Sequence, residues 1–142
     1  MKKGTIALLV VGVFILALVM GTLTTYNGLV SKDEAVATAW GNVQSQYQRR
    51  ADLVPNLVST VKGYAKHESE TLEGVVAARA KATQITVNAD ELTPEKLKQY
   101  QAAQGELSQA LGRLMAIQEN YPQLKANENF SELQAQLEGT EN

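Results

Sequence analysis

The sequence predicts an all-α protein in which an N-terminal transmembrane helix precedes an antiparallel, up-and-down bundle of four helices, the last short or truncated. A stretch near the N-terminus contains no charged residue between Lys3 and Lys32, which is typical of a membrane-spanning helix. In the rest of the chain the large apolar residues recur at steps of three and four, as on one face of a helix. The 142 residues suit one folded domain beside such an anchor.

The apolar stretch is long enough to cross a bilayer. It covers residues 4–23, and 20 helical residues span about 30 Å, the thickness of the hydrocarbon core. A cleaved secretory signal peptide is the alternative, since such peptides also begin with basic residues such as Lys2 and Lys3. However, the stretch is long for a signal peptide, and no clear Ala-x-Ala cleavage site precedes Tyr26. We therefore expect residues 1–25 to form a retained anchor.

Charges on the two sides of the anchor predict its orientation. Lys2, Lys3 and the terminal amine precede it, whereas Lys32 is followed directly by Asp33 and Glu34. Basic residues are enriched on the cytoplasmic side of membrane proteins. The N-terminus is therefore expected in the cytoplasm, and the folded part of the chain outside it.

Residues 26–142 are expected to form the bundle. Turn residues divide the helical pattern into four segments, at about 26–53, 55–82, 94–120 and 129–142. The third segment has the cleanest pattern, a narrow seam that includes Leu97, Tyr100, Leu107, Leu111 and Leu114. Such a seam is typical of helical bundles and coiled coils, and the similar lengths of the first three segments favour antiparallel neighbours.

Prolines and capping residues mark the ends of these segments. Pro55 lacks a backbone N–H and would clash with the carbonyl of Ala51 inside a helix, so we place it in the first turn of a new helix. Thr93 is the expected N-cap of the third segment, with Pro94 in its first turn. One alternative stays open. The apolar stripe runs nearly in phase through Pro55, so the first two segments could form a single rod kinked there.

The fourth segment is shorter than the other three. Asn129 and Glu132 resemble a capping box at its start, and only about 13 residues follow Asn129. Its apolar face therefore covers about two turns, which is too little for a groove along the longer helices. Either the chain is truncated at Asn142, or another molecule completes the bundle.

Several gap-free runs resemble the LemA family. They are RRADLVPNLVSTVKGYAKHE (49–68), LSQALGRLMAIQENYPQLKANENF (107–130), LQAQLEGTEN (133–142), YNGLV (26–30) and the pair Ala39-Trp40. The resemblance implies a membrane-anchored, up-and-down four-helix bundle in the bacterial cell envelope. Family members usually continue beyond the EGTEN run with an Arg-rich helix. They have no established biochemical activity, and are linked loosely to membrane proteases, envelope stress and, for one relative, organelle-like vesicles.

The sequence predicts no catalytic, cofactor-binding or metal site. His67 is the single histidine, and His67-Glu68-Ser69-Glu70 is not the H-E-x-x-H zinc motif, so a solvated helix face is the favoured interpretation. The absence of cysteine excludes disulfides, thiolate metal ligands and a thiol nucleophile. A net charge of −2 gives no basic excess for binding nucleic acid.

A polar tip is the one candidate site for binding a partner. If the first predicted helix leads away from the membrane and the second returns, the turns at 49–56 and 119–129 share the membrane-distal end. The tip would then comprise Arg49, Arg50, Asp52, Asn56, Glu119, Asn120, Lys125, Asn127 and Asn129. The alternative is that these polar residues only build turns. For Arg49 and Arg50, the alternative is that they complement the dipole at a helix C-terminus, with Asp52 pairing locally.

Together these features predict a non-enzymatic scaffold or adaptor that contacts lipid through its N-terminal helix and binds a protein partner or itself. A regulator of a membrane protease or of envelope stress is one alternative. A metal-dependent hydrolase that uses His67 is the other.

Overall fold

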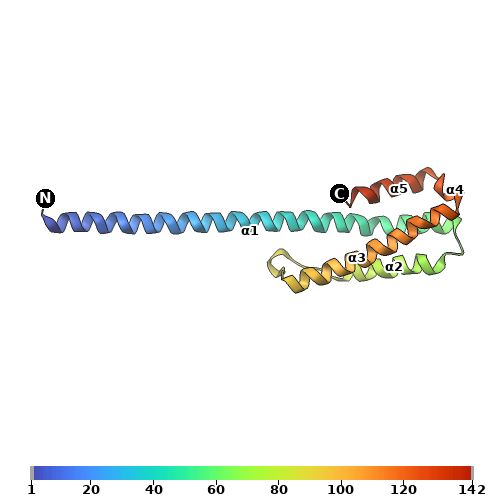
Figure 1. Ribbon diagram of the computed structural model, residues 1–142, viewed down its shortest axis with the longest axis horizontal. Helices are drawn as coiled ribbons and strands as arrows, with labels where there is room; N and C mark the ends of the chain where they lie inside the picture. Colours follow the sequence, from blue (N-terminus) through green and yellow to red (C-terminus); the bar gives the residue numbers. More distant parts are fainter. Residues whose placement is uncertain (1, 142) are drawn as a thin grey trace. The chain divides into compact units, whose positions relative to one another are not determined.

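The computed structural model describes residues 2–141 and is all-α, as predicted (Figure 1). No strand occurs within this range. The helices are α1 (Lys3–Tyr64), α2 (Ser69–Gln84), α3 (Pro94–Ala116), α4 (Pro122–Lys125) and α5 (Glu128–Gly139), with 3₁₀ turns η1 (Ala89–Glu91) and η2 (Ile117–Asn120). The chain divides into two compact units, residues 1–39 and 40–142. They are described separately.

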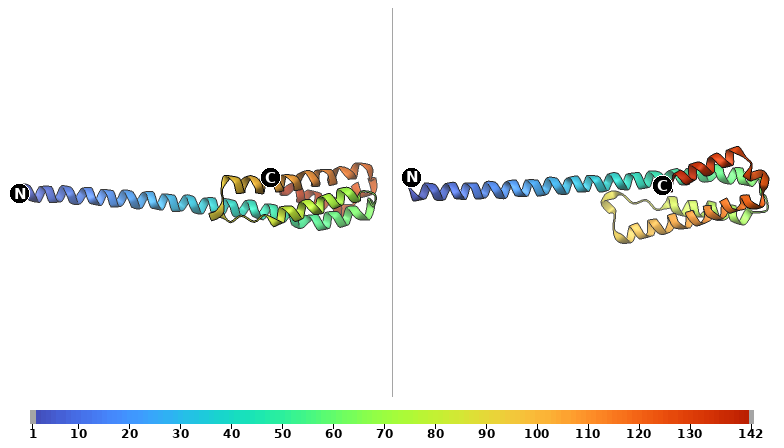
Figure 2. Two further views of the ribbon diagram at one scale, coloured as in Figure 1. Left: turned by 90° about the horizontal axis from the view of Figure 1, so that it is seen from below. Right: turned by 45° about the horizontal axis from the view of Figure 1, so that its top comes forward.

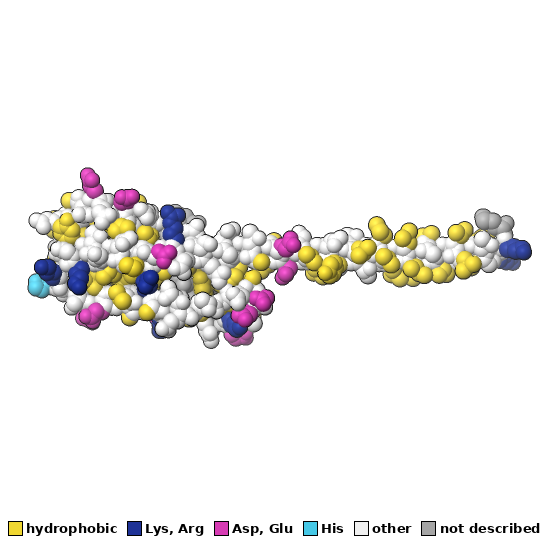
Figure 3. All heavy atoms as spheres, turned by 180° about the vertical axis from the view of Figure 1, so that it is seen from behind, with side chains coloured by type: hydrophobic (Ala, Val, Ile, Leu, Met, Phe, Trp, Pro, Cys, Tyr) yellow, Lys and Arg dark blue, Asp and Glu magenta, His cyan; other side chains and the backbone are white. Residues whose placement is uncertain are grey.

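The described part of the first unit is almost entirely helical and exposes its apolar side chains. No residue of its most apolar 18-residue window is buried, and the helix is long and apolar enough to cross a membrane. Figure 3 shows these apolar side chains along the N-terminal part of α1. Thr22, Thr24 and Thr25 donate their hydroxyls to Val19, Met20 and Gly21 carbonyls of the same helix, so these hydroxyls need no outside partner.

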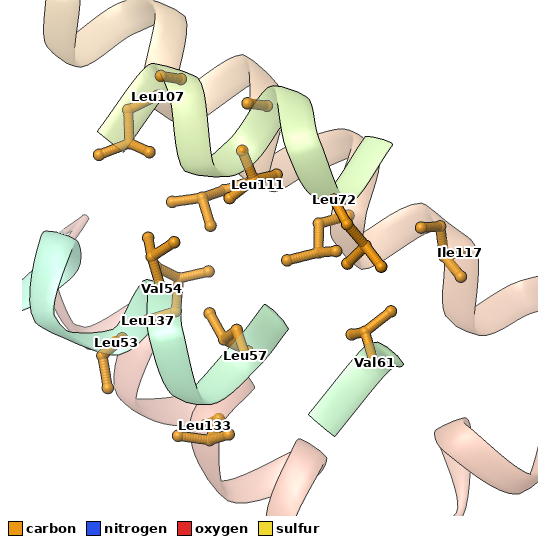
Figure 4. Close-up of a cluster of buried hydrophobic side chains, with 14 of the residues drawn as sticks. Leu53, Val54, Leu57, Val61, Leu72, Leu107, Leu111, Ile117, Leu133 and Leu137 are labelled. Carbon is orange, nitrogen blue, oxygen red and sulfur yellow. The ribbon is translucent and has the colours of Figure 1, made fainter. Parts of the chain in front are cut away.

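The second unit is an antiparallel bundle of four helical segments: the part of α1 from Trp40 onward, α2, α3 and α5 (Figure 2). Its main core is aliphatic, and Figure 4 shows side chains of these segments directed toward one another. The largest fully buried side chains include Phe130, Leu57, Leu107 and Leu114. Burial of each such side chain contributes about 1.5–3 kcal/mol, so this cluster is the principal source of the bundle's stability.

Helix α1 does not end at Pro55, which corrects the prediction of separate helices at 26–53 and 55–82. Pro55 lies inside α1 and has no N–H to donate to the carbonyl of Ala51. That carbonyl instead accepts a hydrogen bond from Nε of Arg79 on α2, at 2.8 Å. Ala51 is only 2% exposed, so the arginine supplies a donor where the buried backbone needs one. The alternative of one rod is therefore correct at Pro55 but wrong further along, because α1 ends at Tyr64 and α2 begins at Ser69.

The other helix ends differ less from prediction. Thr93 is the N-cap of α3, because its hydroxyl accepts the backbone N–H of Lys96 at 3.2 Å, and Pro94 lies in the first turn as predicted. The N-cap of α5 is Asn127, whose Oδ1 accepts the N–H of Phe130 at 2.9 Å. The expected cap at Asn129 was therefore wrong by two residues.

The short helix α5 covers only part of the bundle. Its buried residues Phe130, Leu133 and Leu137 belong to the main core. A second, smaller core contains Trp40, Val87 and Tyr100 and no residue of α5. There, the segment between α2 and α3 packs against α1 and α3 and covers apolar surface that the fourth helix does not reach.

Candidate functional site

The end of the bundle formed by the α1–α2 turn, η2 and α4 contains five of the nine predicted tip residues: Glu119, Asn120, Lys125, Asn127 and Asn129. Here Nδ2 of Asn127 donates to the hydroxyl of Tyr64 at 2.8 Å, and Nδ2 of Asn129 donates to Oγ1 of Thr60 at 3.3 Å. These two asparagines are therefore bound to α1. Whether the tip also binds a partner stays a prediction.

The remaining tip side chains are more available. Lys125 and Glu119 form an ion pair at 3.4 Å in which both side chains are more than half exposed. Such exposed pairs contribute at most about 1 kcal/mol to stability. At this end of the bundle, Glu119 and Lys125 therefore present their charges to solvent, and their ion pair contributes little to stability.

The other four predicted residues, Arg49, Arg50, Asp52 and Asn56, do not lie at this end. Because α1 continues to Tyr64, they lie partway along it, and Asn56 is about 12 Å of helix rise from the helix end. The prediction that the two turns share one end was therefore wrong for 49–56. The actual α1–α2 turn is at 65–68, and its sequence signal was the polar run from Lys66 to Ser69.

Arg50 is buried and bonds to other helices, and does not lie on the surface as the predicted tip would require. It is 5% exposed, and Nη1 donates to Oγ of Ser108 on α3 at 2.8 Å. Nε and Nη2 donate to Oγ1 and the carbonyl oxygen of Thr140, at 3.2 and 3.3 Å. The guanidinium also lies 5.4 Å from the ring centre of Tyr47. Arg50 thus joins α1 to α3 and to the C-terminal end of α5.

This arrangement revises the alternative interpretation of the basic pair. A cation does complement a helix C-terminus, but the helix is α5 and not the one that carries Arg50. Asp52 does pair locally, but with Gln48, whose Nε2 donates to Oδ1 of Asp52 at 2.8 Å. Exposed residues Arg49 and Asp52 line a shallow polar surface of α1. The sequence could not reveal the burial of Arg50, because Thr140 lies 90 positions away.

An aromatic cluster, Trp40, Tyr47 and Tyr100, holds the segment that follows α2. Nε1 of Trp40 and Nε2 of Gln44 both donate to the carbonyl of Val87, each at 2.7 Å. The ring of Tyr100 meets Trp40 and Tyr47 edge-on, with centroid distances of 5.0 and 5.5 Å. Burial, and secondarily the neighbouring Tyr47, raises the pKa of Tyr100 above its ordinary value.

The residues singled out for metal chemistry do not form a site. Within residues 2–141, no three His, Asp or Glu side chains are grouped so as to hold a metal ion. His67 lies in the exposed α1–α2 turn. The hydroxyl of Ser108 on α3 accepts a hydrogen bond from Nη1 of Arg50.

The described residues define a class of protein, a four-helix bundle. The first helix of this chain, α1, begins with a stretch that is apolar and exposed. The particular family follows from comparison with known proteins. The family model described as the LemA family matches residues 39–142, which is most of the chain. The chain belongs to the LemA family, and the predicted family is confirmed. No curated protein matches the chain.

Proposed function

We propose that this protein is a membrane-anchored, non-enzymatic scaffold or adaptor of the cell envelope. The observation that carries the proposal is the exposure of the apolar part of α1. Leu8, Phe14 and Leu16 are each more than 60% exposed, as are several neighbours. Each large apolar side chain costs about 1.5–3 kcal/mol when left in water instead of being buried, so a lipid environment stabilises this segment.

The flanking charges support an orientation. Lys2 and Lys3 lie at one end of the apolar stretch, whereas Lys32, Asp33 and Glu34 largely cancel at the other. We propose that the N-terminus is cytoplasmic and that the bundle lies on the opposite side of the membrane.

The bundle itself supports a binding role over a catalytic one. Two of its arginines, the buried Arg50 and the partly buried Arg79, form hydrogen bonds that hold helices together. Its surface carries charged side chains that are more than half exposed, such as Lys125 and Glu119. Polar side chains of this kind suit recognition of another protein, because rim charges steer and orient a partner at little cost in stability.

The anchor and its orientation are tested by cysteine labelling, since the chain has no native cysteine. One variant carries Ser131→Cys on the exposed surface of α5, and the control carries an extra cysteine directly after Met1. We expect a membrane-impermeant maleimide to label the first in intact spheroplasts and the second only after lysis. Both should stay with the membrane in alkaline carbonate. Release by carbonate, or the reverse labelling pattern, contradicts the proposal.

The scaffold role is tested by proximity crosslinking from Ser131→Cys in native membranes. Recovery of a membrane or envelope protein whose complex depends on the bundle supports it. A partner that is a membrane protease, with altered proteolysis when the bundle is deleted, would instead establish the regulatory alternative.

A further inference from the structure

An open groove runs between the last turns of α1 and the facing side of α2. Its volume is about 420 Å³, and its walls include Val58, Leu72 and Val76 together with Lys62 and Glu73. Val76 is 49% exposed, which is the highest exposure of any large apolar side chain in the described residues from 40 to 141. Removal of apolar surface from water is favourable, so a partner that covers this valine gains stability.

Two opposite charges lie at one end of the groove. Lys62 is two residues before the end of α1 and Glu73 is four residues after the start of α2, so both are close to the α1–α2 turn. Both residues are exposed, and neither belongs to an ion pair found among the described residues. The far end of the groove, at Ala80, carries no charge in its described walls.

This arrangement is self-complementary about a two-fold axis that runs along the groove. Such an axis places α1 of one copy over α2 of the other, with equal distances from the α1–α2 turn in both copies. At 1.5 Å of rise per residue, Lys62 and Glu73 lie about 3 and 6 Å from the helix ends at that turn. Val58 and Val76 lie about 9 and 10.5 Å from the same ends. Lysine therefore meets glutamate, and valine meets valine, at both symmetric contacts.

A two-fold axis across the groove does not pair these charges. It turns the second copy end for end and places Glu73 over the uncharged end of the groove, near Ala80. The axis along the groove instead keeps the two α1 helices running in the same direction. Two chains inserted into one membrane with the same orientation meet this condition.

We propose that the α1–α2 groove binds a second copy of this chain in the same membrane. Lys62 and Glu73 form the charged rim of the interface and set its orientation, whereas Val58 and Val76 form its apolar centre. The inference deepens the proposed scaffold role and rests on the proposed anchor, because confinement to one membrane raises the effective concentration of a weak partner.

The test is co-purification of two differently tagged copies of the full chain, expressed together and solubilised from membranes in mild detergent. We expect native copies to co-purify. If both copies carry Lys62→Glu, or both carry Glu73→Lys, recovery should fall at least about fivefold, because like charges then face each other. A Lys62→Glu copy expressed with a Glu73→Lys copy should return to within about twofold of the native level, because both contacts are again between opposite charges. A pair within one chain cannot produce this rescue.

Val76→Gln tests the apolar centre of the interface. The matched control is Val43→Gln, at a valine of α1 that is 40% exposed and lies outside the groove. Val76→Gln should lower co-purification at least about fivefold, and Val43→Gln should leave it within about twofold of the native level. All variants should melt within a few degrees of the native chain, because the changes are at exposed positions.

Three results overturn the proposal. The first is the absence of co-purification between native copies. The second is co-purification that the charge reversals leave unchanged, which assigns self-association to another surface. The third is a loss that the mixed pair does not rescue, including recovery of a different protein whose binding depends on the same charges. Carbonate extraction of the same membranes separates the two proposals. Release of the chain contradicts the anchor, whereas a retained chain that does not self-associate contradicts this inference alone.

Discussion

Arg50 joins three helices through hydrogen bonds to neutral acceptors. Its charge is buried, and the groups that stabilise it are the hydroxyls of Ser108 and Thr140 and the carbonyl at the end of α5. Only a planar guanidinium can direct donors to all three positions at once, so lysine is not an equivalent residue here.

Replacing Arg50 by methionine should therefore destabilise the bundle by about 2–4 kcal/mol, because it leaves buried acceptors unpaired. Arg50→Lys should cost somewhat less, about 1–2 kcal/mol, since the charge is retained but the fork is lost. The measurement is urea unfolding of the full chain in detergent. Arg49→Met, at an exposed position on the same turn, should change the free energy by less than about 0.5 kcal/mol. Equal effects at both positions would contradict the structural role of Arg50.

Tyr100 makes stability depend on pH at the alkaline end. Its pKa is raised above 10.0 in the folded state, first by burial and then by Tyr47. Above pH 10 the unfolded chain releases this proton more readily than the folded chain does, so folding loses free energy as the pH rises. The contribution of Tyr100 is complete below that pH and is lost above it.

We expect the melting temperature of the native chain to fall more steeply than that of Tyr100→Phe between about pH 9.5 and 11.5. The phenylalanine keeps the aromatic ring but has no proton to lose. Thermal unfolding followed by circular dichroism at several pH values measures the difference. Parallel curves for the two proteins would show that Tyr100 does not titrate differently in the folded state.

At the scale of elements, the main feature is a proline accommodated inside a helix by an arginine from the neighbouring helix. Pro55 removes one bond from α1, and Arg79 of α2 supplies the replacement to the carbonyl of Ala51. The two residues should therefore be energetically coupled although neither contacts the other through a hydrogen bond.

A double-mutant cycle measures this coupling. In the native background, Arg79→Met should cost about 1–3 kcal/mol, because the buried carbonyl of Ala51 loses its donor. In a Pro55→Ala background the new N–H can reach that carbonyl, so the same change should cost less than half as much. Lys81→Met, at an exposed position on α2, serves as the control. Equal costs of Arg79→Met in both backgrounds would refute the compensation.

The elements that local sequence determines were the ones predicted correctly. Thr93 and Pro94 define the start of α3 as predicted. In the apolar seam of α3, Leu97 is partly buried and the other named residues are buried as their spacing indicates. The predicted break at Pro55 was wrong because Arg79, which donates to the carbonyl that Pro55 leaves free, lies 28 residues after Ala51 in the chain. Four of the nine predicted tip residues lie away from the tip for the same reason, since moving one turn from 49–56 to 65–68 moves every residue assigned to it.

At the scale of the molecule, the first unit presents apolar residues and the second presents charges. Three exposed ion pairs lie among the described residues of the bundle. Two of them join Lys125 to Glu119 at the tip and Lys81 to Glu106 between α2 and α3. They offer a matched comparison for locating a partner, because each can be reversed without changing net charge.

If the tip binds a partner, reversing Glu119 and Lys125 together should reduce recovery of the crosslinked complex at least about fivefold, since misplaced charges at an interface are unfavourable. Reversal of Lys81 and Glu106 should leave recovery unchanged. Both variants should melt within a few degrees of the native chain, because exposed pairs contribute little to stability. Equal recovery from all three proteins would exclude these tip charges from the interface.

The carbonyl of Val87 accepts two donors, one of them the indole of Trp40, which is the chain's single tryptophan. Fluorescence of the intact chain therefore comes from one chromophore placed where three segments meet. If the segment after α2 detached from α1, the indole would exchange its carbonyl for solvent, and its emission would shift to longer wavelength. The protein thus contains an intrinsic optical reporter for whether that segment is docked, usable in the membrane and without any added label.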